Sequence, residues 1–107
     1  MKNLLAVCLL TLLLSANASG LPYSIYGSGA QSCGIWVKDR SGENHDYHRT
    51  WLLGYISGVG AVGSASVSFS LQKTGIEAMI AFVDDYCQKN PLVKIEDAGY
   101  ALAQAMR

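Results

Sequence analysis

The sequence predicts an all-α fold, a small bundle of about four helices with one disulfide bond. The first observation behind this prediction is periodicity, because apolar residues recur every three or four positions in several segments after the first thirty residues. The second is the cysteine count, because only Cys33 and Cys87 remain once an export signal is removed. The third is size, since 107 residues are enough for one small domain.

The first 18 residues have the layout of a secretory signal peptide. Lys2 supplies a positive start, Leu4 to Leu14 form an apolar run, and small residues occupy positions 16 and 18. A run of eleven residues is too short to cross a hydrocarbon core of ~30 Å, which disfavours a membrane anchor. We therefore predict cleavage after Ala18 and a periplasmic or secreted protein.

Removing these 18 of the 107 residues leaves 89, with seven basic and eight acidic side chains and a formal charge of −1. Such a chain has no strong field to attract nucleic acid or anionic lipid, so we expect a protein partner or client instead. Two cysteines in an oxidising compartment predict a Cys33–Cys87 disulfide between positions 54 apart. A zinc pair or a catalytic thiol is disfavoured, because no CxxC motif or histidine lies near either cysteine.

Residues 19–31 are rich in glycine and serine and lack helical periodicity, which predicts a flexible N-terminal arm. The helical domain is expected to span residues 32–107. Its first helix is predicted over 32–40, with Trp36 on the inward face, and a turn follows.

The second helix is predicted to begin at His45 or Asp46. Residues 50–72 carry no charge, but their glycines and serines make a membrane span a poor alternative, and we expect no insertion. Gly54 and Gly58 lie one turn apart and predict the close approach of a neighbouring helix. The apolar positions of this helix are Trp51, Leu52, Tyr55, Ile56, Val59 and Val62.

The third helix is predicted to begin at Thr74, with Glu77 completing a capping box, and to end at Asn90–Pro91. The same pair is predicted to start the fourth helix, with Asn90 as N-cap and Pro91 in the first turn. Residues 66–71 alternate in polarity and are expected to form an extended loop rather than a lone strand. The apolar stripes are Ile76, Met79, Ile80, Val83, Tyr86 and Cys87 in the third helix, and Leu92, Ile95, Ala98, Ala101, Leu102 and Ala105 in the fourth.

The densest cluster of potential metal ligands is Glu43, His45, Asp46 and His48. Two histidines three positions apart could share a helix face and bind zinc together with a carboxylate. A metal site needs at least three converging ligands, whereas Asp46 suits a helix N-terminus and solvated histidines are compatible with it. We therefore predict a polar helix start and no metal.

Two further motifs do not indicate an enzyme. Residues 58–63 match GxGxxG, but a helix precedes them and the domain has no room for a dinucleotide-binding sheet. Asp84 and Asp85 are adjacent and would point about 100° apart on a helix, so they cannot act on one substrate atom. Since no serine or cysteine nucleophile motif is present, we expect neither an enzymatic activity nor a cofactor.

Three segments, Ser32–Gly34, Trp51–Tyr55 and Asp85–Pro91 with its YCxxNP pattern, together resemble one family. This is the HdeA/HdeB-like superfamily of small exported, disulfide-linked helical proteins, which includes acid-stress chaperones and uncharacterised members. The resemblance implies a Cys33–Cys87 bond between the first and third helices. It also implies a homodimer that opens at low pH and binds unfolding client proteins.

The build is also similar to the Rap/Tai-type immunity proteins, which neutralise type VI secreted peptidoglycan amidases in the periplasm. This second resemblance leaves a periplasmic immunity protein as the alternative function. In either case we expect helix packing at Trp36, Trp51, Gly54, Gly58, Tyr86 and Pro91.

Overall fold

The computed structural model describes residues 23–63 and 74–107, and the fold within them is all-α. The predicted bundle of about four helices with a Cys33–Cys87 bond is confirmed. The leader predicted over 1–18 and the loop predicted over 66–71 lie outside the described residues. The described elements are the 3-10 helix η1 (Gly27–Ala30) and the α-helices α2 (Cys33–Asp39), α3 (Asn44–Val62), α5 (Ile76–Lys89) and α6 (Ile95–Ala105).

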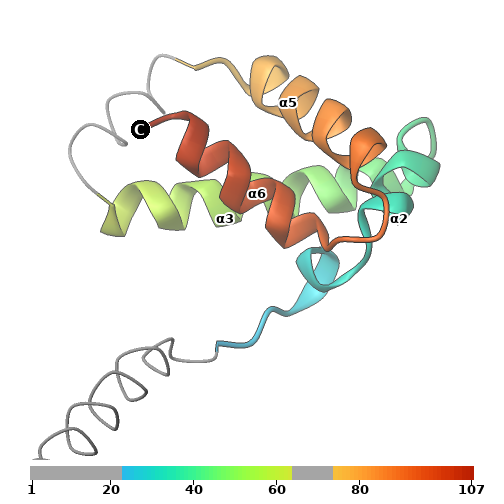
Figure 1. Cartoon of the computed structure of the whole chain (residues 1–107), viewed down its shortest axis with the longest axis horizontal. Coiled ribbons are helices and arrows are strands. Elements are labelled where there is room, and N and C mark those ends of the chain that lie inside the picture. The colour runs from blue at the N-terminus through green and yellow to red at the C-terminus, as the bar shows by residue number, and fades with distance from the viewer. Residues whose placement is uncertain (1–22, 64–73) are drawn as a thin grey trace, which may run out of the picture.

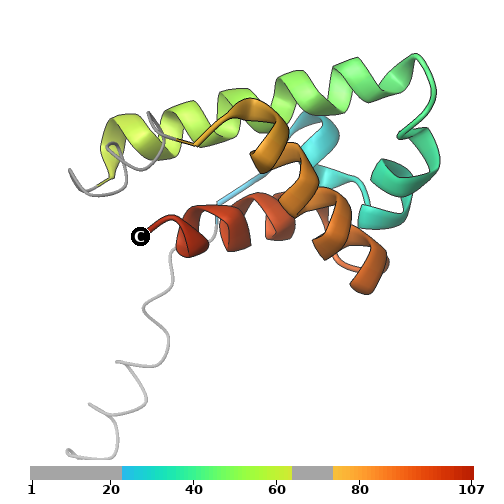
Figure 2. The same ribbon diagram turned by 90° about the horizontal axis from the view of Figure 1, so that it is seen from above.

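Helix α6 contacts every other described helix. It packs against α3, α5 and η1, and α2 packs on α5 at one end (Figure 1, Figure 2). The helices turn their apolar stripes toward one another, as the spacing of apolar residues predicts. The buried apolar side chains form one core: Cys33, Trp36, Leu52, Ile56, Met79, Ile80, Val83, Cys87, Ile95, Ala98, Leu102, Ala103 and Met106.

The prediction of a flexible arm is wrong for residues 27–31. Helix η1 packs on α3 and α6, and both Ser28 and Gly29 are buried. A Cβ atom at Gly29 would overlap the ring of Trp51, so this glycine permits a close approach rather than flexibility. The segment is anchored at its end as well, because the backbone N–H of Ile95 donates to Gln31 O over 2.9 Å.

The predicted starting points of two helices are also wrong. Helix α5 begins at Ile76, with Gly75 rather than Thr74 as N-cap. Helix α6 begins at Ile95 instead of Pro91, and the backbone N–H of its N-cap, Lys94, donates to Asp97 Oδ2 over 2.9 Å.

Helix α6 begins later than predicted because of hydrogen bonds between the residues before it and α2. The backbone N–H of Cys33 donates to Val93 O and that of Gly34 to Pro91 O, so the first turn of α2 uses these carbonyls. These bonds keep residues 91–93 as a turn, because the carbonyls that would start a helix there are directed at α2.

Within the described residues, Gly54 and Gly58 do not mediate helix packing. Both are exposed, and no atom of the described residues lies within 4 Å of a Cβ built at either position. The prediction of close approach there is wrong. The glycine that does allow helices to meet is Gly99 of α6, where a Cβ would lie 3.0 Å from the ring of Tyr55.

Alanine at Gly54 or Gly58 is therefore expected to raise the free energy of unfolding by about 0.5–1 kcal/mol each, because glycine inside a helix costs backbone entropy. Urea unfolding followed by circular dichroism at neutral pH measures this. Gly99→Ala is the matched control and is expected to destabilise, because its methyl group meets Tyr55. A loss of stability in Gly54→Ala would contradict the assignment of an open helix face.

Candidate functional site

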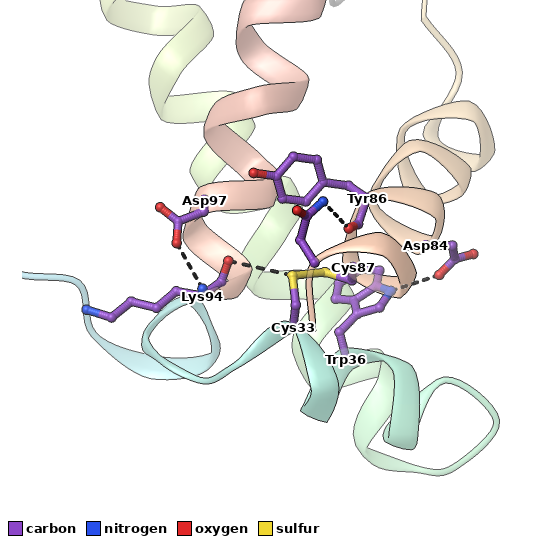
Figure 3. The surroundings of a disulfide bond; sticks show 8 residues. Cys33, Trp36, Asp84, Tyr86, Cys87, Lys94 and Asp97 are labelled. Atoms are coloured by element: carbon purple, nitrogen blue, oxygen red, sulfur yellow. Dashed lines mark hydrogen bonds between the residues drawn. A yellow bond between two sulfur atoms is a disulfide. The ribbon is translucent and has the colours of Figure 1, made fainter. Parts of the chain in front are cut away.

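The disulfide joins the first residue of α2 to the last turn of α5. Cys33 and Cys87 are fully buried, with their Cα atoms 4.7 Å apart (Figure 3). Trp36 lies one turn further along α2 and is also fully buried. The bond therefore fixes the start of α2 against the end of α5, close to the hydrogen bond between Trp36 and Asp84.

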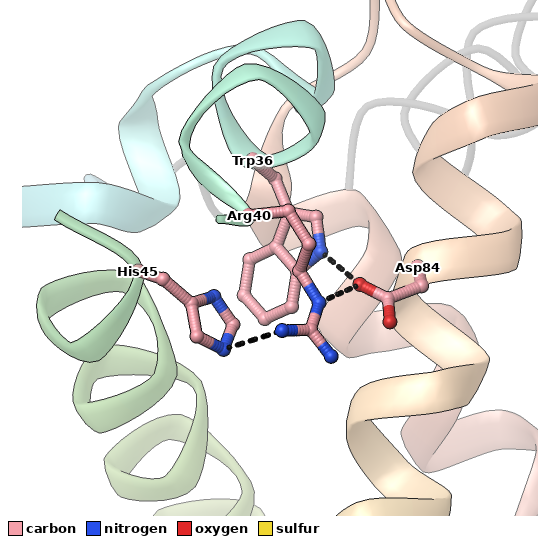
Figure 4. A network of polar contacts seen from close by, with 4 residues as sticks. All are labelled: Trp36, Arg40, His45 and Asp84. Atoms are coloured by element: carbon pink, nitrogen blue, oxygen red, sulfur yellow. Dashed lines mark hydrogen bonds and ion pairs between the residues drawn. The ribbon is translucent and has the colours of Figure 1, made fainter. Parts of the chain in front are cut away.

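A polar network formed by Trp36, Arg40, His45 and Asp84 links three helices (Figure 4). The indole Nε1–H of Trp36 donates to Asp84 Oδ1 of α5 over 2.8 Å. Arg40, at the end of α2, donates from Nε to the same oxygen over 2.8 Å and from Nη1 to His45 Nε2 of α3 over 3.3 Å. One carboxylate oxygen thus holds both an indole and a guanidinium in place.

The partners of His45 fix its protonation state. Arginine can only donate, so the contact with Arg40 requires an unprotonated Nε2 on His45. Burial, followed by the positive charge of Arg40, lowers the pKa of His45 below its ordinary value of 6.5. The edge of the ring also meets Trp36, with ring centroids 5.5 Å apart. The folded protein therefore favours neutral His45.

Acid is expected to weaken the fold through His45. As the pH falls below 6.5, the unfolded chain binds a proton at His45 before the folded protein does, so stability present above that pH is lost. We expect the free energy of unfolding, measured in urea between pH 7.5 and 5 in roughly half-unit steps, to fall less steeply in His45→Gln than in the wild type. Equal slopes would contradict this assignment, since His48 is the other histidine of the chain and is common to both proteins.

A second network contains a buried histidine. His48 Nε2 lies 2.8 Å from Asp39 Oδ2 of α2, and His48 Nδ1 lies 2.9 Å from Ser28 Oγ of η1. Because a carboxylate accepts, the Nε2–H of His48 donates to Asp39. The hydrogen bond between Nδ1 and Ser28 runs from the hydroxyl to a neutral ring and from the ring to the hydroxyl oxygen when the ring is protonated. His48 is 3% exposed and Ser28 is fully buried.

The Ser28–His48–Asp39 set has the members of a serine hydrolase triad. The two ring nitrogens have exchanged roles, because in such triads Nδ1 pairs with the carboxylate and Nε2 with the serine. Ser28 Oγ is also shut off from solvent, and no pocket was found among residues 23–63 and 74–107. In this conformation the set holds η1, α2 and α3 together and cannot receive a substrate.

A third polar centre is Glu96 of α6, which is 7% exposed. Its Oε1 accepts hydrogen bonds from Tyr23 of the arm over 2.8 Å and from Tyr55 of α3 over 3.3 Å. The hydrogen bond to Glu96 and the charge of Glu96 raise the pKa of Tyr23. Burial, followed by the charge of Glu96, raises the pKa of Tyr55. Both hydroxyls therefore stay protonated and remain donors to the carboxylate.

The candidate metal ligands do not converge. Glu43 is exposed before α3, His45 faces Arg40, and His48 is engaged by Ser28 and Asp39. Within the described part of the chain, no three histidine, cysteine or acidic side chains form a group that could hold a metal ion. The expectation that the histidines are solvated is wrong for His48, which is buried.

The remaining predicted packing residues lie nearer the surface. Tyr86 stacks on Phe82 with ring centroids 6.4 Å apart, and Trp51 stacks on Tyr55 at 5.2 Å. Both Trp51 and Tyr86 are partly buried and pack on the core. Pro91 is exposed in the turn before α6, where its carbonyl binds the first turn of α2.

Sequence reasoning missed the residues that tie these networks together. Ser28 falls in the segment predicted to be a flexible arm, and Glu96 falls beside a predicted apolar stripe. One available signal was the placement of Asp39 and His48 at the facing ends of two helices joined by a short turn. That arrangement lets a histidine near the start of the second helix meet a carboxylate at the end of the first.

Comparison with protein-family models, with curated proteins and with solved structures found no match. None of the helices in the described ranges is long and apolar enough to cross a membrane.

Proposed function

We propose that this chain is an exported helical protein that binds other proteins, and that it acts as an acid-stress chaperone. The observation that carries the proposal is that carboxylates hold the helix contacts. Asp84 ties α5 to α2, Asp39 ties α2 to α3, and Glu96 ties α6 to both the N-terminal arm and α3. Arg49 of α3 also pairs with Glu77 of α5 over 3.0 Å.

Acid acts on all of these contacts at once. Aspartic and glutamic acids are ionised at neutral pH and protonated at about pH 2–3. A hydrogen bond to an ionised carboxylate is roughly twice as strong as one between neutral groups, so protonation weakens each contact. Protonation therefore weakens the contacts between helices rather than the backbone hydrogen bonds within each helix.

The change in net charge on acidification also favours opening of the bundle. At neutral pH the seven basic and eight acidic side chains that follow residue 18 nearly cancel. With every carboxylate protonated and both histidines charged, the same residues carry a formal charge of +9, from seven lysines and arginines plus two histidines. Self-repulsion of this size favours an expanded state.

An expanded state has apolar surface to offer to a client. Trp36, Leu52 and Ile80 meet at the joints between helices and are almost completely buried at neutral pH. The Cys33–Cys87 bond does not depend on pH and keeps α2 and α5 linked while the other contacts open. This combination favours a compact acid state with exposed apolar surface, which is suited to capture aggregating proteins.

The test is an aggregation assay. An enzyme that precipitates on acidification is brought to about pH 2–3 with and without an equimolar or larger amount of the protein, and light scattering is recorded during and after neutralisation. We expect suppressed scattering with the protein present and no effect when both are held at neutral pH. Unchanged scattering would overturn the proposal, and tight binding of an amidase at neutral pH would favour the immunity function.

A further inference from the structure

The N-terminal arm, residues 23–31, lies on an aromatic shelf formed by Trp51 and Tyr55 of α3. The two rings of the shelf stack at 5.2 Å between centroids. The indole Nε1–H of Trp51 donates to the backbone carbonyl of Tyr26 over 2.8 Å, and Gly29 lies directly against the indole ring. The arm therefore shows what the shelf binds: a backbone carbonyl and, beside it, a residue without a side chain.

We infer that the shelf is a binding site for glycine- and serine-bearing stretches of unfolded polypeptide, that the arm fills it at neutral pH, and that acid releases the arm. This inference rests on the proposed chaperone function. A donor that binds a main-chain carbonyl does not select a sequence, because every residue offers that group. The indole face restricts the residue that can occupy the position of Gly29 to glycine, since a Cβ there would overlap the ring.

Two contacts hold the arm in place, and one of them is acid-sensitive. Ser28 is hydrogen-bonded to His48, and Tyr23 donates to Glu96. A protonated carboxyl is a weaker acceptor for the tyrosine than an ionised one, so acid weakens the contact with Glu96. The hydrogen bond between Ser28 and His48 persists in either protonation state of the ring, because a serine oxygen can accept as well as donate.

The groups facing these two contacts come from several helices. Asp39 of α2 faces His48 directly, and Asp84 of α5 reaches the Trp36 indole, whose ring lies 6.4 Å from that of His48. Tyr55 of α3 faces Glu96 together with Tyr23, and Asp97 and Tyr100 of α6 act on Tyr23 from the same helix as Glu96.

Covalent attachment explains why a client does not displace the arm at neutral pH. A short tether gives the arm an effective concentration in the millimolar range, well above that of a client in solution. Once its contact with Glu96 weakens, the tethered arm competes less well. The site is then open under the same conditions that unfold client proteins.

The test uses a variant that displaces the arm without acid. Gly29→Ala places a methyl group where the Trp51 ring lies, so the arm cannot seat. Gly58→Ala is the matched control, because no described atom lies near a Cβ there. The probe is a fluorescein-labelled peptide with the sequence of residues 23–31, and its binding is followed by fluorescence anisotropy at neutral pH.

We expect Gly29→Ala to bind the peptide at least about tenfold more tightly than the wild type, because a covered site is competent only in a minor fraction of molecules. Gly58→Ala is expected to match the wild type, and adding Trp51→Ala to Gly29→Ala is expected to remove the gain. Equal binding by Gly29→Ala and the wild type, with native helix content and an intact disulfide, overturns the inference.

If Gly29→Ala does not fold, Ser28→Ala replaces it, since it removes only the hydroxyl that bonds His48, and a gain in peptide binding is again expected. Failure of this inference is separable from failure of the proposed function. If the wild type protects clients in acid but neither variant binds the peptide, the inference about the shelf is overturned and the chaperone function is not. Peptide binding by the variants without acid protection supports the shelf and overturns the chaperone function.

Discussion

Replacing both Cys33 and Cys87 by alanine is expected to lower the free energy of unfolding by about 4 kcal/mol. The bond links positions 54 apart and so removes a large share of the conformational freedom of the unfolded chain. Small domains are stable by only about 5–15 kcal/mol, which makes this a large fraction of the total. Urea unfolding at neutral pH, followed by far-ultraviolet circular dichroism, measures the loss.

Alanine is preferred to serine in this variant because both positions are fully buried and alanine adds no polar group to the core. Reduction of the wild type with a thiol reagent is the control that changes no residue, and it should produce a similar loss. If both treatments lower stability by less than about 1 kcal/mol, far below the expectation for this loop, the bond is not what holds α2 to α5.

Trp36→Ala is expected to cost about 3–5 kcal/mol, the usual range for removing a fully buried large aromatic side chain. The indole fills the space between α2, α3 and α5, and its loss also takes one donor from Asp84. Leu92→Ala is the control, because Leu92 is 94% exposed and its truncation should change stability by no more than about 0.5 kcal/mol. Similar effects of the two substitutions in urea unfolding would show that Trp36 is not a core residue.

Local sequence signals are sufficient for much of the fold. Met79, Ile80, Val83 and Cys87 recur at helical spacing, and all of them are buried on the inner face of α5. The pairing of Cys33 with Cys87 follows from counting cysteines after the predicted signal peptide is set aside. Both signals are properties of the chain alone, which is why they could be read without a structure.

The features that were missed depend on contacts between distant segments. Gly29 and Gly58 are the same residue type, and only their neighbours show that Gly29 lies under an indole while no described atom lies close to Gly58. Asn90–Pro91 has the signals of a helix start, yet the N-terminal N–H groups of α2 hold the following turn. Ser28 is part of a buried network only because η1 packs on α3.

The central claim is that ionised carboxylates hold the helices in contact. Near-ultraviolet circular dichroism tests it most directly, because Trp36 and Trp51 report the packing of the helices against one another. Between pH 7 and about pH 3, where carboxylates become protonated, we expect the near-ultraviolet signal to be lost while most of the far-ultraviolet helix signal remains. A near-ultraviolet spectrum at pH 3 that is identical to the spectrum at pH 7 would contradict the claim.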